Sequence, residues 1–107
     1  MTDAEKTQVL VDKLFGGKAP QRLAPATIGY GKVMPFSPFT SIEDAFMCVE
    51  KGGFYIDLSG PCDRRAASPF WICTVHDPQG SGRSVRSDHA DIPARAIAEA
   101  IYLAVQV

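Results

Sequence analysis

The fold of this chain is decided by residues 39–53, which read FTSIEDAFMCVEKGG. Thr40 can cap the first turn of a helix, and Glu43, three residues later, can complete a capping box. The apolar residues recur at helical spacing and form one stripe: Ile42, Ala45, Phe46 and Val49. Gly52 and Gly53 tolerate the left-handed turn that commonly ends a helix. A strand-like run over 54–58 follows, so we expect this helix to lay its apolar stripe on a sheet.

Two more helices are predicted at the ends of the chain. Thr2 and Glu5 repeat the capping-box spacing, and a modest apolar face runs through residues 10–15 before Gly16. Asp91 can cap a final helix whose first turn contains Pro93. The buried stripe of that last helix is expected at Ile97, Ala100, Ile101, Ala104 and Val105.

The middle of the chain predicts an antiparallel meander. Residues 54–58 and 70–75 are rich in aromatic and β-branched residues, and residues 83–87 form a shorter third strand. Turn residues separate these runs over 59–68 and 77–82. The expected order is helix, arm, helix, three strands, helix. This is an α+β fold in a single domain spanning residues 1–107, with helices layered on a small sheet.

Residues 18–38 form a proline-rich segment that cannot continue either flanking helix. The segment is longer than most connections in small domains, and it carries more apolar residues than a free linker would expose. We expect an extended arm that packs on its own domain or on a neighbouring subunit of a homo-oligomer.

Composition excludes several classes of protein. The chain has 107 residues, 46% of them hydrophobic, and a formal net charge of -1, which argues against a nonspecific grip on nucleic acid. No apolar run approaches the ~20 residues that span a bilayer. The three cysteines, Cys48, Cys62 and Cys73, lack a disulfide framework spacing, and the polar N-terminus does not resemble a signal peptide. We therefore expect reduced thiols and a cytoplasmic location.

The run over residues 37–46, SPFTSIEDAF, followed by Val49-Glu50-Lys51, resembles the phage "ABA sandwich" domain family. In that family a Ser-Pro-x-Thr-x-Ile segment opens a helix that ends in Val-Glu-Lys. Residues 10–16 and 90–97 are similar to the family's first and last helices. The chain departs from the family pattern at Phe46, where a tryptophan is usual, and in its longer arm. The resemblance implies a small phage or prophage protein, and it brings no activity and no site residues.

Catalytic and metal-binding patterns are weak. Cys73 and His76 have a metal-ligand spacing, but positions three apart on a strand point to opposite faces. Four residues permit acid–base chemistry but are explained as ordinary turn and cap residues: Asp57, Asp88, His89 and Asp91. Nothing matches a phosphate-binding loop or a nucleophile motif. We therefore expect no catalytic residue, no metal and no cofactor.

The basic residues after Gly52 are all arginines, whose planar fork suits phosphates and stacks on aromatic rings. Gly80-Ser81-Gly82 adds flexible backbone amides next to these arginines. This segment is either an anion-binding nest or a hairpin turn that binds no ligand. The predicted ligand-binding residues are Arg64, Arg65, Arg83, Arg86, Ser81, Ser84, His89, Tyr55 and Trp71. The alternative is a solvated arginine surface paired with neighbouring carboxylates.

Two hypotheses about function follow from these patterns. The first is a non-enzymatic binding protein, encoded by a phage or prophage, that sequesters a small phosphorylated nucleotide used as a host immune signal. The second is a protein–protein interaction module that covers a host or phage partner with its apolar arm. An enzyme ranks third, because no catalytic motif is present.

Overall fold

The computed structural model describes residues 2–20, 22–24, 32–62, 70–76, 84–87 and 90–106. The helices are α1 (Asp3–Leu14), α2 (Ile42–Gly52) and α3 (Pro93–Val105). The strands are β1 (Arg22–Ala24), β2 (Lys32–Met34), β3 (Tyr55–Cys62), β4 (Phe70–His76) and β5 (Ser84–Arg86). The α+β fold predicted from the sequence is confirmed.

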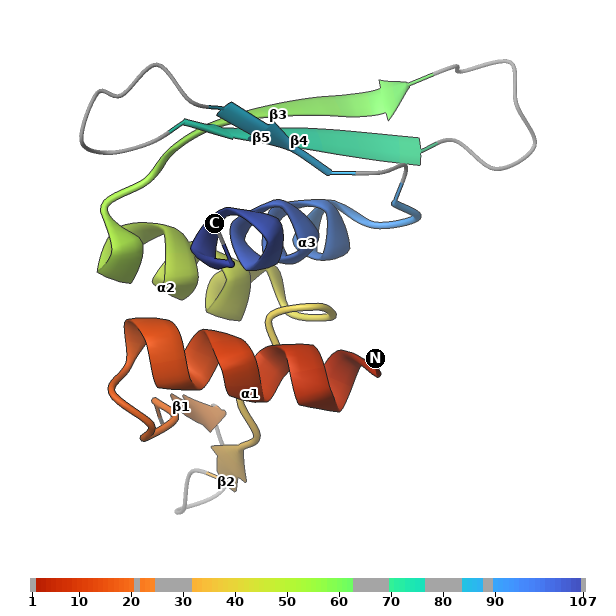
Figure 1. Ribbon diagram of the computed structural model, residues 1–107. Helices are drawn as coiled ribbons and strands as arrows, with labels where there is room; N and C mark the ends of the chain where they lie inside the picture. Colours follow the sequence, from red (N-terminus) through yellow and green to blue (C-terminus); the bar gives the residue numbers. More distant parts are fainter. Residues whose placement is uncertain are drawn as a thin grey trace.

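The central element is α3, which lies on one face of the β3–β4–β5 sheet and carries α2 and α1 on its other side (Figure 1). Most of its residues are buried: Ala94, Ala96, Ile97, Ala98, Ala100, Ile101 and Tyr102. The side that carries Arg95, Glu99 and Leu103 is partly exposed. A helix that is apolar over most of its circumference is typical of a core helix. The molecule is therefore layered as sheet, then α3 with α2, then α1.

The sheet is the antiparallel meander that the turn residues predict. β4 is its central strand, with Leu58 of β3 opposite Cys73 and Val85 of β5 opposite Val75. Gly60 lies directly against the Trp71 ring, and a Cβ atom at residue 60 would collide with the indole. Trp71 also exchanges two backbone hydrogen bonds with Ala90, of 2.7 and 3.0 Å. Trp71 thus joins the entry to α3 to the sheet.

The prediction that residues 39–53 pack directly on the sheet is wrong. Helix α2 packs mainly on α3 and, less extensively, on α1. Its buried residues are Asp44, Ala45 and Cys48, whereas Ile42 and Phe46 remain 37% and 45% exposed. The helix is therefore rotated away from the orientation that its apolar stripe favours.

Asp44 explains this rotation. Its side chain is 1% exposed, and its Oδ2 accepts the backbone N–H of Ser37 at 2.9 Å. The N-cap is Ser41, one residue after the predicted Thr40, and its hydroxyl accepts the Asp44 N–H at 3.4 Å. Because Asp44 fastens the end of the arm to the helix start, it must face inward.

The helix ends follow sequence signals to different degrees. Thr2 caps α1 as predicted, accepting the N–H of Glu5, and Gly53 closes α2 in the left-handed conformation at φ 66°. The predicted cap at Asp91 is wrong: the N-cap is Ile92, and it makes no side-chain cap bond. Asp91 instead lies 3.5 Å from Arg95 Nε.

Ion pairs fasten α1 to α3. Arg95 donates two hydrogen bonds to the Asp3 carboxylate, of 3.0 and 2.7 Å, and Lys6 pairs with Glu99 at 3.0 Å. The bond from Arg95 lowers the pKa of Asp3. Both pairs are partly exposed, so each contributes at most about 1 kcal/mol. The two pairs thus link α1 to α3 at defined points, but they contribute little to the free energy of folding.

The arm contains a structure that the sequence did not predict. β1 and β2 form an antiparallel ribbon in which Leu23 is opposite Val33. Beyond the ribbon, Phe36 packs edge-on against Phe15 at 5.4 Å between ring centroids, and Pro38 is fully buried. The end of the arm is thus built into the body of its own domain.

Replacing Asp44 tests the account of the α2 orientation. Asp44→Ala removes the acceptor for the Ser37 N–H, which costs about 1–3 kcal/mol because a partly buried donor then lacks this partner. Asp44→Asn keeps an oxygen at that position and should lose less. Urea unfolding followed by circular dichroism measures both variants. An Asp44→Ala protein as stable as the parent would contradict the role given to this side chain.

Candidate functional site

The face of the sheet that points away from α3 is the main candidate surface. No described helix or strand covers it (Figure 1). Side chains alternate along each strand, so the register places two rows that cross all three strands on this face, next to the β3–β4 pair of Ser59 and Ile72. The first row is Tyr55, His76 and Ser84, and the second is Asp57, Thr74 and Arg86. We call these six residues the outer sheet face.

Three of the predicted ligand-binding residues meet on the outer sheet face. Tyr55 is 72% exposed, and Ser84 and Arg86 are exposed on the edge strand β5. Tyr55 and Ser84 stand two strand spacings apart, about 10 Å. An aromatic ring, a hydroxyl and a guanidinium therefore point to the same side of the sheet.

The other acidic and basic groups of this face are paired with each other. His76 Nε2 lies 2.8 Å from Asp57 Oδ2, a diagonal contact between β3 and β4. No ion pair joins Arg86 to a carboxylate within the described part of the chain. Because Asp57 is engaged by His76, the guanidinium of Arg86 is the cationic group that this face offers to an anion.

The remaining predicted site residues do not join this group. Trp71 lies on the opposite face, packed against the core, so Trp71 and Tyr55 cannot stack on the same base. The other five lie outside the described residues: Arg64, Arg65, Ser81, Arg83 and His89. Arg95, another of the arginines after Gly52, is committed to Asp3.

Sequence reasoning missed the contribution of His76 and Asp57 to this face. It placed both residues at strand ends and gave them no shared role. Their contact depends on the register between β3 and β4, in which Asp57 is opposite Thr74 and His76 is opposite Tyr55. The sequence between the two strands does not fix that register. What the sequence does show is that Asp57 and His76 each alternate with apolar residues along their own strand.

The described residues carry no metal-binding constellation. None of them form a group of three or more His, Cys, Asp or Glu side chains placed to hold an ion. Cys73 is fully buried on the α3 side of β4, whereas His76 points to the outer sheet face. The two residues therefore face opposite sides of the strand, as their spacing predicts.

The two described thiols are poorly suited to nucleophilic chemistry. Burial, with a smaller contribution from the Asp44 carboxyl, raises the pKa of Cys48 to about 12. Burial, with a smaller contribution from Asp57, raises the pKa of Cys73 to about 11. The thiolate is the reactive form of cysteine, so both residues are inert near neutral pH.

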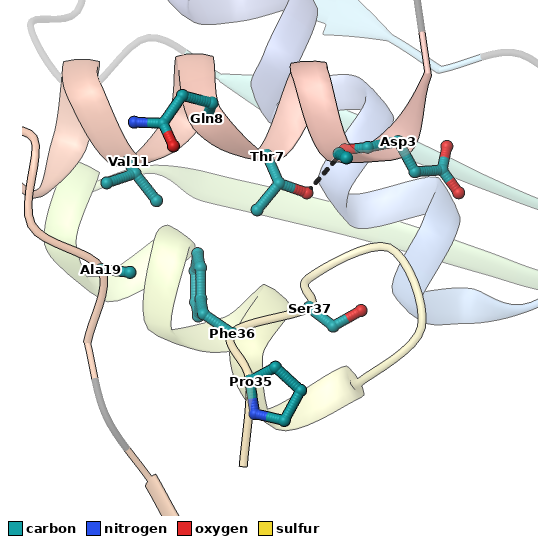
Figure 2. Close-up of a pocket in the computed structure, with 9 residues that line it drawn as sticks. Asp3, Thr7, Gln8, Val11, Ala19, Pro35, Phe36 and Ser37 are labelled. Carbon is teal, nitrogen blue, oxygen red and sulfur yellow. Dashed lines mark hydrogen bonds between the residues drawn. The ribbon is translucent and has the colours of Figure 1, made fainter. Parts of the chain in front are cut away.

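A concave surface lies between α1 and the end of the arm (Figure 2). This groove has a volume of about 430 Å³, and the Phe36 ring points across it toward α1. Its polar groups are engaged elsewhere: Asp3 binds Arg95, the Thr7 hydroxyl donates to the Asp3 carbonyl, and Gln8 donates to Asp12. The groove thus offers fewer polar groups to orient a ligand than the outer sheet face.

Comparison with protein families, curated proteins and solved structures finds no match to this chain. The resemblance to the phage ABA sandwich family therefore stays a prediction. No helix in the described ranges has both the length and the apolar character needed to cross a membrane.

Alkylation tests the state of the thiols. Native protein treated with iodoacetamide at pH 8 should keep Cys48 and Cys73 unmodified, because raised pKa values leave almost no thiolate there. Reactivity should appear only as the pH approaches 11 for Cys73 and 12 for Cys48. Mass spectrometry of digested peptides locates the label, and unfolded protein is the positive control. Rapid native labelling of either residue at pH 8 would contradict this assignment.

Proposed function

We propose that this chain is a non-enzymatic binding protein that holds a small phosphorylated nucleotide on the outer sheet face. The observation that carries the proposal is the position of Tyr55, Ser84 and Arg86 on one exposed face of the sheet, with Tyr55 on β3 and the other two on β5, across the central strand β4. Exposed aromatic rings on sheets provide stacking platforms for bases. Arginine and serine are suitable partners for phosphate oxygens.

The chemistry of this face favours binding over turnover. The base stacks on Tyr55, and the phosphate meets Arg86 and the Ser84 hydroxyl near the edge of the sheet. His76 and Asp57 support the platform through their mutual contact, which holds the His76 ring beside Tyr55 in the same row. No nucleophile or metal is required for this role.

Binding without turnover corresponds to sequestration. A phage or prophage protein with this property would lower the free concentration of a nucleotide signal that its host uses in immunity. The phage assignment comes from the resemblance of residues 37–51 to the ABA sandwich family. The oligomer expected from the arm would multiply the number of sites in each particle.

A ligand screen tests the proposal. The purified protein is examined by thermal shift and calorimetry against cyclic di- and trinucleotides and cyclic ADP-ribose isomers. At least one compound should raise the melting temperature and be recovered chemically intact. Tyr55→Ala should weaken its binding by about tenfold or more, the typical loss for one stacked base. Arg86→Ala should weaken it similarly, because it removes the charge that meets the phosphate.

Lys51→Ala is the matched control, since Lys51 is an exposed cation on α2 and away from the sheet. It should bind like the parent. A parent protein that binds none of these nucleotides would overturn the proposal, as would an Arg86→Ala variant of unchanged affinity. Recovery of a cleaved product would replace it with an enzymatic function.

A protein–protein interaction module is the second candidate, and the exposed apolar stripe of α2 favours it. Ile42 and Phe46 are more exposed than large apolar residues of a compact core. If the chain acts only on a protein partner, no nucleotide in the screen will shift its melting temperature. The screen therefore separates the two candidates.

A further inference from the structure

The long edge of the main sheet has no strand beside it in the described part of the chain. The sheet order is β3–β4–β5, so β3 forms one edge and β5 the other (Figure 1). β5 is short and carries Arg86, two features by which natural sheets avoid pairing with other chains. β3 has eight residues, and Asp57 is the charged residue among them. Of the two described edges, β3 is therefore the one open to a further strand.

The register shows which backbone groups of β3 point to this edge. The Cys73 carbonyl accepts the N–H of Ser87 at 2.8 Å, so the backbone groups of Cys73 point toward β5. Leu58 lies opposite Cys73 on β3, and the two residues therefore do not bond to each other. Leu58 directs its N–H and C=O away from β4, to the free edge. The alternation of the strand directs those of Ile56 there as well.

Gly60 continues this alternation. A Cβ atom at residue 60 would collide with the Trp71 ring, which lies on the core side of the sheet, as Ile56 and Leu58 do. Residue 60 therefore has the orientation of residues 56 and 58, and its backbone groups also face the free edge. Among the described residues, none donates a backbone hydrogen bond to these groups or accepts one from them.

We propose that β3 pairs antiparallel with β3 of a second copy, so that the two sheets of a two-fold dimer become one continuous sheet. The two-fold axis passes beside Leu58, which lies opposite Leu58 of the second copy. Ile56 lies opposite Gly60 of the second copy, and each of these pairs exchanges both of its N–H···O bonds. The pairing satisfies the edge-directed groups of residues 56–60, and two-fold symmetry makes it closed and self-limiting.

Charge and existing hydrogen bonds select this register over its two neighbours. A pairing centred on Asp57 would place two carboxylates directly opposite each other, which is unfavourable. A pairing centred on Ile56 would need the N–H of Phe54, which already donates to a carbonyl of α2 at 3.1 Å. The register centred on Leu58 avoids both conflicts, because Asp57 then lies opposite Ser59 of the second copy.

The side chains of β3 fit the same register. On the core side, Ile56 and Leu58 are partly exposed. The pairing brings Leu58 against its own counterpart and places Ile56 beside Gly60, which has no side chain to obstruct it. On the other side of the sheet, Pro61 lies opposite Tyr55. The missing N–H of Pro61 is not needed there, because the residues that face Tyr55 across the new contact form a pair without hydrogen bonds.

Charges at residue 59 test the pairing. Sedimentation of the parent chain over a dilution series should show a reversible dimer. Ser59→Asp places like charges opposite Asp57 at two symmetric positions, and it should raise the dissociation constant about fivefold or more at low salt. Ser59→Lys places opposite charges there and should lower the dissociation constant. Ser59 is exposed, so both variants should keep the fold.

Ala4→Asp is the matched control, since it adds the same charge at an exposed position of α1, away from the sheet. It should leave the dimer unchanged. A parent chain that is monomeric at the highest concentration would overturn the proposal. Equal dissociation constants for the Ser59→Asp and Ser59→Lys variants would overturn it as well, and so would an equal loss caused by Ala4→Asp and Ser59→Asp.

A disulfide bond reads the register directly. Opposite residues of an antiparallel pair that are not hydrogen-bonded have Cα atoms about 4.5 Å apart, within the range of a disulfide. A mixture of Asp57→Cys and Ser59→Cys chains, oxidised by air, should therefore become linked between residues 57 and 59. Mass spectrometry of digested peptides locates the bond. A mixture without this bond would overturn the pairing, and an Asp57→Cys chain that links to itself through residue 57 would overturn the register.

This inference does not rest on the nucleotide site. The hydrogen bonds of the pairing lie in the plane of the sheet, whereas the side chains of Tyr55 and Asp57 stay on the outer sheet face. A dimer that binds no nucleotide would overturn the proposed function alone, and a monomer that binds one would overturn the dimer alone.

Discussion

The structure depends on the burial of most of α3. This helix contacts the sheet, α2 and α1, and it presents apolar side chains to the sheet and to α2 while Arg95 and Glu99 pair with α1. Ala94, Ala96, Ala98 and Ala100 are 0–3% exposed, and their small side chains let neighbouring backbones approach closely on several sides. Ile97 and Ile101 fill the remaining space at 0% exposure. Since interiors are packed to crystal-like density, a larger residue at most of these alanines would force strands or helices apart.

Both candidate surfaces are consequences of this central position. Because α3 covers one side of a three-stranded sheet, the other side carries the six residues of the outer sheet face together with Ser59 and Ile72. Because α2 packs on α3 and is pinned by Asp44, its opposite side exposes Ile42 and Phe46. The same arrangement that closes the core therefore leaves one polar face and one apolar stripe available for binding, at different places on the molecule.

The sequence predicted the order of elements well, because turn residues and caps are local signals. Thr2 and Gly53 mark helix ends that the structure keeps, and β4 ends at His76, one residue after its predicted end. The predicted turn at residue 59 is wrong, because β3 continues to Cys62. The sequence failed at α2, where periodicity counts Ile42 and Phe46 as core residues but cannot weigh the hydrogen bond between Asp44 and the Ser37 N–H. It also missed β1 and β2, since three-residue strands between prolines give no clear alternation.

The site was predictable only in part, for a related reason. Period-two alternation identifies which residues of one strand share a face. It does not show which residues of the neighbouring strand lie opposite them. The grouping of Tyr55 with Ser84 and Arg86 needs the register through His76 and Thr74. Trp71 was predicted to stack on a base because it is aromatic. Its backbone hydrogen bonds to Ala90 and its contact with Gly60 instead make it part of the core.

Hydrogen exchange of the native protein, resolved by peptide, tests the central role of α3 most directly. Amides in the interior of the most buried elements open only with global unfolding. The account predicts that α3 and β4 exchange most slowly, that α2 is intermediate, and that α1 exchanges faster than either. Slower exchange in α2 than in α3 would contradict this prediction. It would indicate that residues 39–53, and not α3, form the most stable part of the fold.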